Sequence, residues 1–277
     1  MSRDVKLRKA VIPAAGKGTR LLPLTRTVPK EMLPLGRKPV LHHIVDELLA
    51  AGLEQILFVI SADKSCIPKY FDDGSGRFFS VAQESQIGLA DAVLQAEGFA
   101  AGEPVAVALG DSVISSGERT QVTRRLLDAY DSLDAGCVIA VEEVPVADAP
   151  RYGIVKPKAG VRDVFEIEDL VEKPAARELP SNLAIAGRYV LSPEMFDLIR
   201  RVKPGAGGEL QLTDAIRLAL GAGIRVWCVR LTKTERRIDI GTFGSYFEAL
   251  MAACCSDEEL GNRMRRIAGA WGESGSS

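Results

Sequence analysis

Short apolar runs alternate along this chain with segments whose apolar residues recur at the spacing of a helix. In the first half, the strand-like runs lie at residues 10–12, 55–60, 78–83, 105–109 and 136–144. The helical periods between them lie at residues 40–51, 64–71, 90–101 and 119–133. Near-continuous apolar strands are typical of parallel sheets that helices cover on both faces. The alternation therefore predicts an α/β fold, Rossmann-like and mixed, with a mostly parallel central sheet flanked by helices.

The pattern changes after residue 151. Strands are expected there at residues 152–155, 164–171, 183–191 and 224–231, and helices at 193–200 and 209–220. We expect a smaller lobe that continues the first, so that residues 1–255 form one domain with halves at 1–150 and 151–240. Helices at 242–254 and 257–267 should follow, and the segment 256–277 should end in a disordered tail at 272–277.

The first apolar run opens into a loop of small residues that carries two positive charges, AAGKGTR at residues 14–20. A further charge, Lys30, follows in the turn at 29–34. Glycines let backbone N–H groups approach anionic oxygens, and lysine and arginine neutralise them, so this loop suits a polyphosphate. Small residues at 14–16 also leave room for a flat base. Gly-x-Gly after a strand is often only a turn, and this loop is neither a P-loop nor the dinucleotide fingerprint.

Charge and cysteine content limit the possible partners. The net charge is −2 and the isoelectric point about 5.9, which argues against a nucleic-acid binder. No apolar run is long enough to span a membrane, and the N-terminus carries no apolar signal core, so no membrane partner is expected. The five cysteines are odd in number and lack metal-site spacing, so we expect reduced, structural thiols in a cytoplasmic protein.

The stretch GKGTRLLPLTRTVPKEMLPLGRKPV at residues 16–40 closely resembles the N-terminal signature of sugar-1-phosphate nucleotidylyltransferases. Within that family, PKEMLPL and the later NLAIAGRY at 182–189 are most similar to bacterial UTP–glucose-1-phosphate uridylyltransferases. The resemblance extends from Lys9 to about Ala252. It implies Mg²⁺-dependent nucleotidyl transfer from UTP to glucose 1-phosphate, which gives UDP-glucose and pyrophosphate. We also expect a homo-oligomer, either a dimer or a tetramer, with the apolar terminal helices at the subunit contact.

The resemblance also implies roles for individual residues, with the nucleotide in the half 1–150 and the sugar in the half 151–240. The implied nucleotide-binding residues are Ala14, Ala15, Gly16, Gly18, Thr19, Glu31, Gln83, Gly88 and Asp111. The implied sugar-phosphate-binding residues are Gly153, Glu172, Lys173, Gly187 and Arg188. The implied catalytic residues are Arg20, Lys30 and Lys173, and the implied ligands of one Mg²⁺ are Asp111 and Asp239.

Taken alone, several of these residues have an ordinary structural interpretation. Asp111 closes a buried strand, where an aspartate is as often a helix or turn cap as a metal ligand, and Asp239 has the same ambiguity. Gln83 stands at a strand end, where glutamine is usually a surface residue, although its amide offers a donor and an acceptor that suit uracil or thymine. His42 and His43 lie in a helical pattern without metal or triad spacing, and we interpret them as structural.

The chain lacks a base–nucleophile pair, and nucleotidyl transfer does not require one. The second pKa of a phosphate monoester is about 6, so the attacking oxygen is already ionised near neutral pH.

Some features resemble glucose-1-phosphate thymidylyltransferases instead, namely the short segment 72–77, Gly110-Asp111 and Asp239-x-Gly-Thr. Asp91 also departs from the uridylyltransferase pattern. A dTTP-dependent enzyme, or one for another sugar 1-phosphate, is therefore an alternative. A non-catalytic nucleotide-sugar-binding regulatory protein is an alternative of a different class, and a kinase would require motifs that this sequence lacks.

Overall fold

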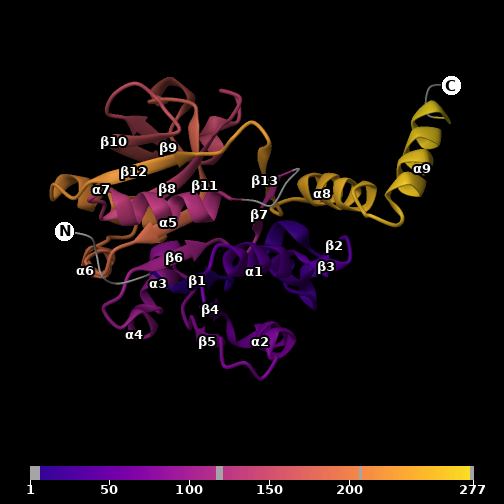
Figure 1. Ribbon diagram of the computed structural model, residues 1–277, viewed down its shortest axis with the longest axis horizontal. Coiled ribbons are helices and arrows are strands. Elements are labelled where there is room, and N and C mark those ends of the chain that lie inside the picture. Colours follow the sequence, from indigo (N-terminus) through magenta and orange to yellow (C-terminus); the bar gives the residue numbers. More distant parts are fainter. Residues whose placement is uncertain (1–6, 117–120, 206–207, 275–277) are drawn as a thin grey trace.

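Figure 1 shows the computed structural model of the protein, which describes residues 7–116, 121–205 and 208–274. Its centre is a nine-stranded sheet in the order β5-β4-β1-β6-β11-β8-β12-β10-β9. These strands are β1 (Lys9–Pro13), β4 (Gln55–Ile60), β5 (Phe78–Ala82), β6 (Val105–Ala108), β8 (Cys137–Glu143), β9 (Gly153–Pro157), β10 (Val164–Glu172), β11 (Leu183–Leu191) and β12 (Val226–Arg230). Within the sheet, β11 and β10 run antiparallel to their neighbours and the remaining strands share one direction. The predicted mixed, mostly parallel α/β sheet is confirmed.

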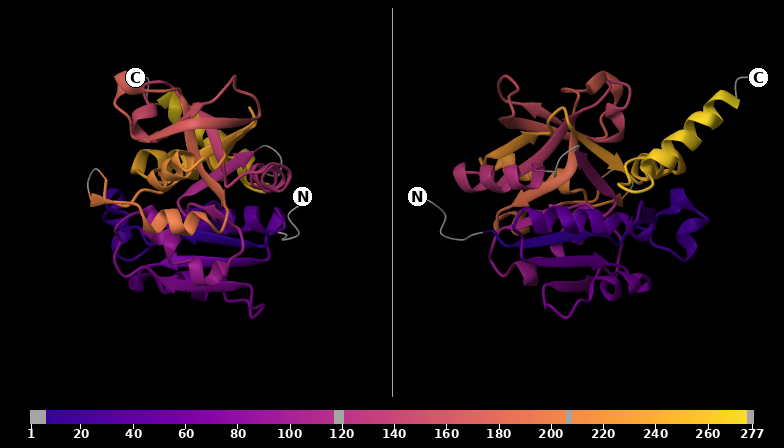
Figure 2. Two further views of the ribbon diagram at one scale, coloured as in Figure 1. Left: turned by 90° about the vertical axis from the view of Figure 1, so that its left-hand side faces the viewer. Right: turned by 45° about the vertical axis from the view of Figure 1, so that its right-hand side comes forward.

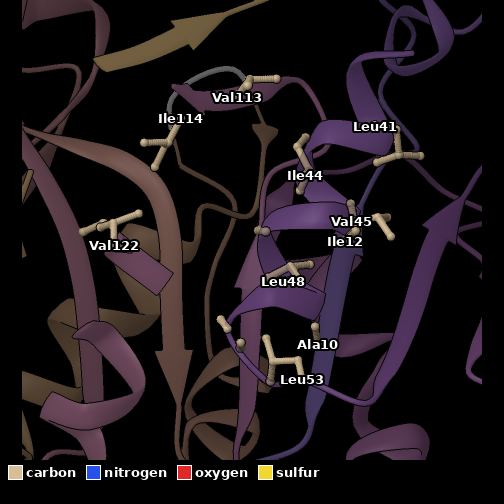
Figure 3. Packing of buried hydrophobic residues seen from close by; sticks show 14 of the residues in the cluster. Ala10, Ile12, Leu41, Ile44, Val45, Leu48, Leu53, Val113, Ile114 and Val122 are labelled. Atoms are coloured by element: carbon tan, nitrogen blue, oxygen red, sulfur yellow. The ribbon is translucent and has the colours of Figure 1, made fainter. Parts of the chain in front are cut away.

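Strand β1 shows how this sheet is buried on both faces. Ala10 and Ile12 belong to one apolar cluster, which includes residues of α1 (Val40–Ala50) and α5 (Val122–Ser132); part of it is drawn in Figure 3. Val11, between them, belongs to the opposite cluster. That second cluster is formed with α3 (Leu89–Leu94), α6 (Met195–Arg200) and α7 (Leu212–Gly221). Successive side chains of a strand point to opposite faces, so an unbroken apolar run is the pattern that two helical layers require.

A small antiparallel sheet, which the sequence pattern did not indicate, lies beside the large one. It pairs β7 (Ser112–Ser116) with β13 (Glu235–Asp239). The register sets Asp239 opposite Ser112, and the backbone N–H of Ile240 donates to the Asp111 carbonyl at 2.9 Å. Two segments that are far apart in the sequence are therefore joined next to both aspartates.

Apart from short 3₁₀ helices, the remaining elements are β2 (Pro34–Leu35), β3 (Lys38–Pro39), α2 (Cys66–Phe71), α4 (Glu97–Ala100), α8 (Phe243–Cys255) and α9 (Gly261–Ser274). The sequence pattern did not predict β2 and β3, whereas the helices follow the predicted pattern with shifted boundaries. The single helix expected at 90–101 is divided into α3 and α4. Among the described residues, no helix has the length and apolar character needed to cross a membrane.

The C-terminal helices α8 and α9 extend away from the sheet, as the yellow ribbon shows in Figures 1 and 2. Helix α8 is anchored through Tyr246, whose hydroxyl donates to the Pro34 carbonyl at 3.1 Å. The expectation of a disordered tail from residue 272 is wrong for 272–274, because α9 continues to Ser274. The rest of that expected tail, 275–277, lies outside the described residues.

The two predicted halves of the chain contribute to the same sheet. Strand β11 of the second half lies between β6 and β8 of the first, and β12 pairs in parallel with β8. This supports the expectation that residues 151–240 continue the first half, while the division of the chain at 150 and 255 stays a prediction.

Candidate active site

Two cavities meet beyond the carboxyl ends of β1 and β6. Cavity A, about 530 Å³, is lined by residues 15–19 of the glycine loop (residues 14–20) together with Lys30, Glu31, Gln83, Gly88 and Asp111. Cavity B, about 460 Å³, is lined by residues from both halves of the chain, among them Arg20, Asp111, Asp239, Gly153, Glu172, Lys173, Gly187, Tyr152 and Arg237. The two cavities share Asp111, with Leu89 and Leu109. Ligands of parallel α/β sheets bind at this end of the strands.

A buried lysine that the sequence analysis missed holds the glycine loop. Lys64 is 4 % exposed, and its Nζ donates to the carbonyl oxygens of Ala14 at 2.6 Å and Gly16 at 2.7 Å. The same ammonium contacts both carboxylate oxygens of Glu31, at 3.0 and 2.9 Å. Because the carbonyls are held on the Lys64 side, the loop has a fixed backbone geometry before any ligand binds. Nothing local in the sequence around Lys64 indicates this role, since its partners lie 33 to 50 residues away.

Glu31 supports the loop from within the protein. Its side chain is 1 % exposed, and burial raises the pKa of its carboxyl, while Lys64 and Lys30 act in the opposite direction. Glu31 also lines cavity A, and its assignment to the nucleotide site stays a prediction. Within the protein, it neutralises the buried ammonium that positions Ala14 and Gly16.

Lys30 lies where the two cavities meet. Its Nζ donates to Asp111 Oδ2 at 2.5 Å, and both side chains are largely buried. Burial acts to lower the pKa of Lys30, but the carboxylates of Asp111 and Glu31 outweigh it and the pKa is raised. Lys30 therefore stays a cation, placed between the glycine loop and the shared wall of the cavities.

The two aspartates that the sequence singled out do converge. Both line cavity B, and the β7–β13 pairing places their backbones side by side. Burial, followed by the neighbouring Asp111 carboxylate, raises the pKa of Asp239, and Arg237, Lys30 and Arg20 oppose this effect. The space beside Asp239 is tight at Gly241, where an added Cβ would lie 2.8 Å from Asp239 Oδ2 and 3.4 Å from Arg20 Nη2. Two carboxylates that repel each other, with cations close by, form a site that a divalent ion would stabilise.

The donor set fits magnesium with the help of a substrate. Among the described residues, no cluster of three or more histidine, cysteine, aspartate or glutamate side chains is placed to hold a metal ion. Magnesium commonly binds one or two protein carboxylates and takes its other ligands from water and substrate phosphates. Asp111 and Asp239 agree with that arrangement, whereas a structural metal site would need more protein ligands.

The predicted sugar-side residues gather at the far wall of cavity B. Burial raises the pKa of Glu172, although Lys173 and the Thr213 hydroxyl, which donates to Oε2 at 3.3 Å, act to lower it. Lys173 lies next to it with a φ of 46°, and its Nζ is 3.6 Å from Glu172 Oε1. Gly153 has no room for a side chain, since a Cβ would lie 2.9 Å from Ile185 Cδ1 and 3.1 Å from Glu172 Oε2. At Gly187, a φ of 73° favours glycine in the middle of β11.

Arg188 is a correction to the predicted site. Its side chain is 1 % exposed, and its Nε and Nη2 donate to Glu47 at 3.0 and 2.7 Å, while Nη2 also donates to the Ser112 carbonyl at 2.9 Å. The guanidinium therefore lies inside the protein and does not line cavity B. The prediction that Arg188 binds the sugar phosphate is wrong for the side chain, which ties β11 to α1 and to the segment that follows Asp111.

Arg237 is a cavity residue that the sequence analysis did not single out. Its Nε donates to Glu142 at 2.5 Å, and its guanidinium stacks on the Tyr152 ring at 4.2 Å from the centroid. It lines cavity B two residues before Asp239 on β13, so the two side chains lie on the same face of the strand. A charged run such as ERRID gives no indication of which side chain faces a cavity, because this depends on the pairing of β13 with β7.

The two histidines have the structural roles that were expected. His42 Nδ1 lies 2.9 Å from the Tyr70 hydroxyl, and His43 Nε2 lies 2.8 Å from the Leu35 carbonyl. Neither residue lines cavity A or cavity B. All five cysteines are free, with Cys137 and Cys228 buried in strands.

The comparisons with known proteins agree with this geometry. The model of the family described as "Nucleotidyl transferase" matches residues 9–255. The UTP–glucose-1-phosphate uridylyltransferase of Mycoplasma pneumoniae is 40 % identical over 270 residues, which cover 88 % of this chain and 91 % of that protein.

Two solved structures extend the similarity to the fold. A UDP-glucose pyrophosphorylase complexed with UDP-glucose superimposes with a TM-score of 0.83 at 34 % identity, covering 89 % of this chain and 98 % of that one. A UTP-bound UGPase from Acinetobacter baumannii gives a TM-score of 0.86 at 30 % identity, with 95 % and 98 % covered. The resemblance seen in the sequence is thus confirmed over most of the chain and over the fold, and the chain belongs to the nucleotidyl transferase family.

Proposed function

We propose that this protein transfers the uridylyl group of UTP to glucose 1-phosphate, forming UDP-glucose and releasing pyrophosphate. The observation that carries the proposal is the meeting of cavities A and B at Asp111, with Lys30 bonded to it. Two anionic substrates can approach each other there next to a fixed cation. The relatives named for this reaction, and the solved relative complexed with UDP-glucose, support the same choice.

UTP is assigned to cavity A. The base lies against Ala14, Ala15 and Gly16 and meets Gln83 and Gly88, while the backbone of Gly18 and Thr19 faces the phosphates. These residues line the cavity or lie within the loop that forms its wall. Lys30 and Arg20 neutralise the negative charge of the triphosphate.

Glucose 1-phosphate is assigned to cavity B. Glu172 accepts hydrogen bonds from sugar hydroxyls, Lys173 pairs with the phosphate, and the glycines at 153 and 187 let the sugar approach the backbone. An ionised phosphate oxygen attacks the α-phosphorus of UTP in line. As that bond forms, the bond from the α-phosphorus to the bridging oxygen breaks, and its electron pair leaves on pyrophosphate. No proton has to be removed from the nucleophile, which agrees with the lack of a histidine in either cavity.

Asp111 and Asp239 are assigned as the residues that hold Mg²⁺. When bound, the ion would supply positive charge to phosphate oxygens of the triphosphate. Both carboxylates line cavity B, so they would hold this charge at the wall of the cavity assigned to the nucleophile.

The dTTP-dependent alternative is kept because the segment between α2 and β5 is short and Asp239-x-Gly-Thr matches thymidylyltransferases. One assay separates the possibilities: purified protein with Mg²⁺ and a panel of nucleoside triphosphates and sugar 1-phosphates, with pyrophosphate release followed over time. We expect the highest kcat/KM with UTP and glucose 1-phosphate. A preference for dTTP or another sugar would replace the assignment within the family, and no turnover with any pair would favour a regulatory protein.

Two further predictions concern the state of the protein in the cell. We propose a homo-oligomer, a dimer or tetramer, because α8 exposes Phe247 (56 %) and Met251 (47 %) on its surface. The molar mass in solution, measured by light scattering, tests this.

The five free thiols support a cytoplasmic location, since that compartment keeps cysteines reduced.

A further inference from the structure

The Gln83 amide makes an unusual pair of contacts at the edge of cavity A. Its Nε2 donates to Asp91 Oδ2 at 2.7 Å and to the Gly88 carbonyl at 3.2 Å. Gln83 is 4 % exposed, and its backbone N–H is bonded to the Ile60 carbonyl at 2.8 Å, so the residue has little freedom to move. Asp91 lies in the first turn of α3 and also receives a weaker contact from Gln95, at 3.4 Å.

These contacts fix which end of the amide carries the nitrogen. An ionised aspartate and a backbone carbonyl only accept hydrogen bonds, whereas an amide NH₂ group has two hydrogens to give. The reverse orientation would set the amide oxygen against two other oxygens. The assignment of nitrogen and oxygen therefore follows from the chemistry of the neighbours.

The oxygen of the same amide is left for a ligand. Among the described residues, no hydrogen bond reaches Gln83 Oε1. It is also not one of the buried polar atoms without a partner, which in the described part of the chain are Ser112 Oγ and Trp227 Nε1. Gln83 lines cavity A, and its oxygen is therefore the group of this amide that a ligand in the cavity can use as an acceptor.

We propose that Asp91 is a positioning residue that turns the acceptor end of Gln83 toward the base and thereby selects uracil or thymine over cytosine. Uracil and thymine carry an N3–H donor that can bond to the amide oxygen. Cytosine has an unprotonated N3, so two acceptors would face each other and the amide oxygen would be left without a partner in the complex. This inference rests on the assignment of the base to Gln83 in the proposed function. It adds a residue, Asp91, that determines base specificity through Gln83 without contacting the base itself. At this position the sequence departs from the uridylyltransferase pattern.

The test compares UTP with CTP in wild type, Asp91→Asn and Asp91→Ala. Without the carboxylate, only the longer bond to the Gly88 carbonyl holds the Gln83 amide, which can then turn and present its NH₂ group to cytosine N3. We expect the ratio of kcat/KM for UTP to kcat/KM for CTP to fall by about tenfold or more in both variants. Asp91→Glu, which keeps the carboxylate, should recover part of the ratio. An equal loss with both nucleotides, or an unchanged ratio, would mean that Asp91 only supports the packing of α3 and would overturn the proposal.

A binding measurement separates this inference from the proposed function. Calorimetric titration of UTP and CTP without a sugar phosphate gives the same ratio from dissociation constants, with no turnover required. If wild type prefers UTP and the Asp91 variants lose the preference, the inference stands even where no UDP-glucose is formed. If wild type prefers CTP, the inference is overturned. Asp197→Asn, a change of an 82 % exposed carboxylate on α6, is the matched control and should leave both ratios unchanged.

Discussion

Lys30 and Asp111, which stand 81 residues apart in the sequence, are joined by a hydrogen bond of 2.5 Å where the two cavities meet. Removing the ammonium by Lys30→Ala takes away a fixed cation and leaves two neighbouring carboxylates with less compensation. We expect kcat for pyrophosphate release to fall by about 100-fold or more, while the variant still unfolds in one cooperative thermal transition. Steady-state assays and a thermal melt measure the two effects.

Lys38→Ala is a suitable control for that experiment. Lys38 pairs with Asp46 at 2.6 Å on the surface, with both side chains nearly half exposed, so its removal should change neither quantity. Near-normal turnover of Lys30→Ala would remove Lys30 from the chemistry and leave it as a structural partner of Asp111.

Lys64 provides a test of the support beneath the glycine loop. In Lys64→Met, the buried Glu31 carboxylate loses its partner, and two loop carbonyls lose their donor. Breaking one side of a buried ion pair is expected to lower the free energy of unfolding by about 3–5 kcal/mol. The double variant Lys64→Met/Glu31→Leu should recover much of that stability, but its KM for UTP should stay high because the loop is no longer held. Urea unfolding and initial-rate kinetics distinguish the two effects, and a normal KM in the double variant would contradict the role assigned to Lys64.

The sequence predicted the large sheet well because both of its faces are covered. Burial on two sides leaves strands such as QILFVI of β4 almost free of polar residues, and that pattern is visible without any long-range information. The small sheet had no such signal. Strand β13 reads ERRID, and its pairing with β7 depends on contacts between segments about 120 residues apart, which no local pattern reports.

Local sequence patterns also separate the site residues that were predicted from those that were missed. Asp111 and Lys30 stand next to recognisable local patterns, a buried strand end and a basic turn. Arg188 also stands in a recognisable stretch, but its partner Glu47 is 141 residues away, and only the packing of α1 against β11 shows that the guanidinium is buried. Lys64 was missed for the same reason, because its importance comes entirely from distant carbonyl and carboxylate groups.

The raised pKa of Glu172 makes the free energy of unfolding depend on pH. Burial raises the pKa of this carboxyl above its unfolded value, so it favours folding below about pH 4.5, and that contribution is lost as the pH rises through the folded pKa. Glu172→Gln removes the titration. The variant should therefore be the more stable protein at pH 7, and its advantage should disappear as the pH falls below 4.5. Urea unfolding between pH 4 and 8 measures the difference.

The same variant tests the assignment of Glu172 to the sugar hydroxyls. KM for glucose 1-phosphate should rise by about tenfold or more, because hydrogen bonds to a charged acceptor are lost, while KM for UTP should stay near the wild-type value. Glu178→Gln, whose side chain is 62 % exposed in the following turn, is the control. An increase confined to KM for UTP would mean that Glu172 contacts the nucleotide and would contradict its assignment to the sugar.

Asp239 tests the acidic pair as the site of the divalent ion. Chelation with EDTA should abolish pyrophosphate release, and added Mg²⁺ should restore it. In Asp239→Asn, one of the two aspartate carboxylates that line cavity B is replaced by a neutral amide, so the half-saturating Mg²⁺ concentration should rise by about tenfold or more. Asp46→Asn, an exposed change on α1, should keep the wild-type Mg²⁺ requirement. Identical Mg²⁺ dependence in Asp239→Asn and wild type would show that the ion is bound without Asp239, and the raised pKa of this residue would then reflect burial and the nearby Asp111 alone.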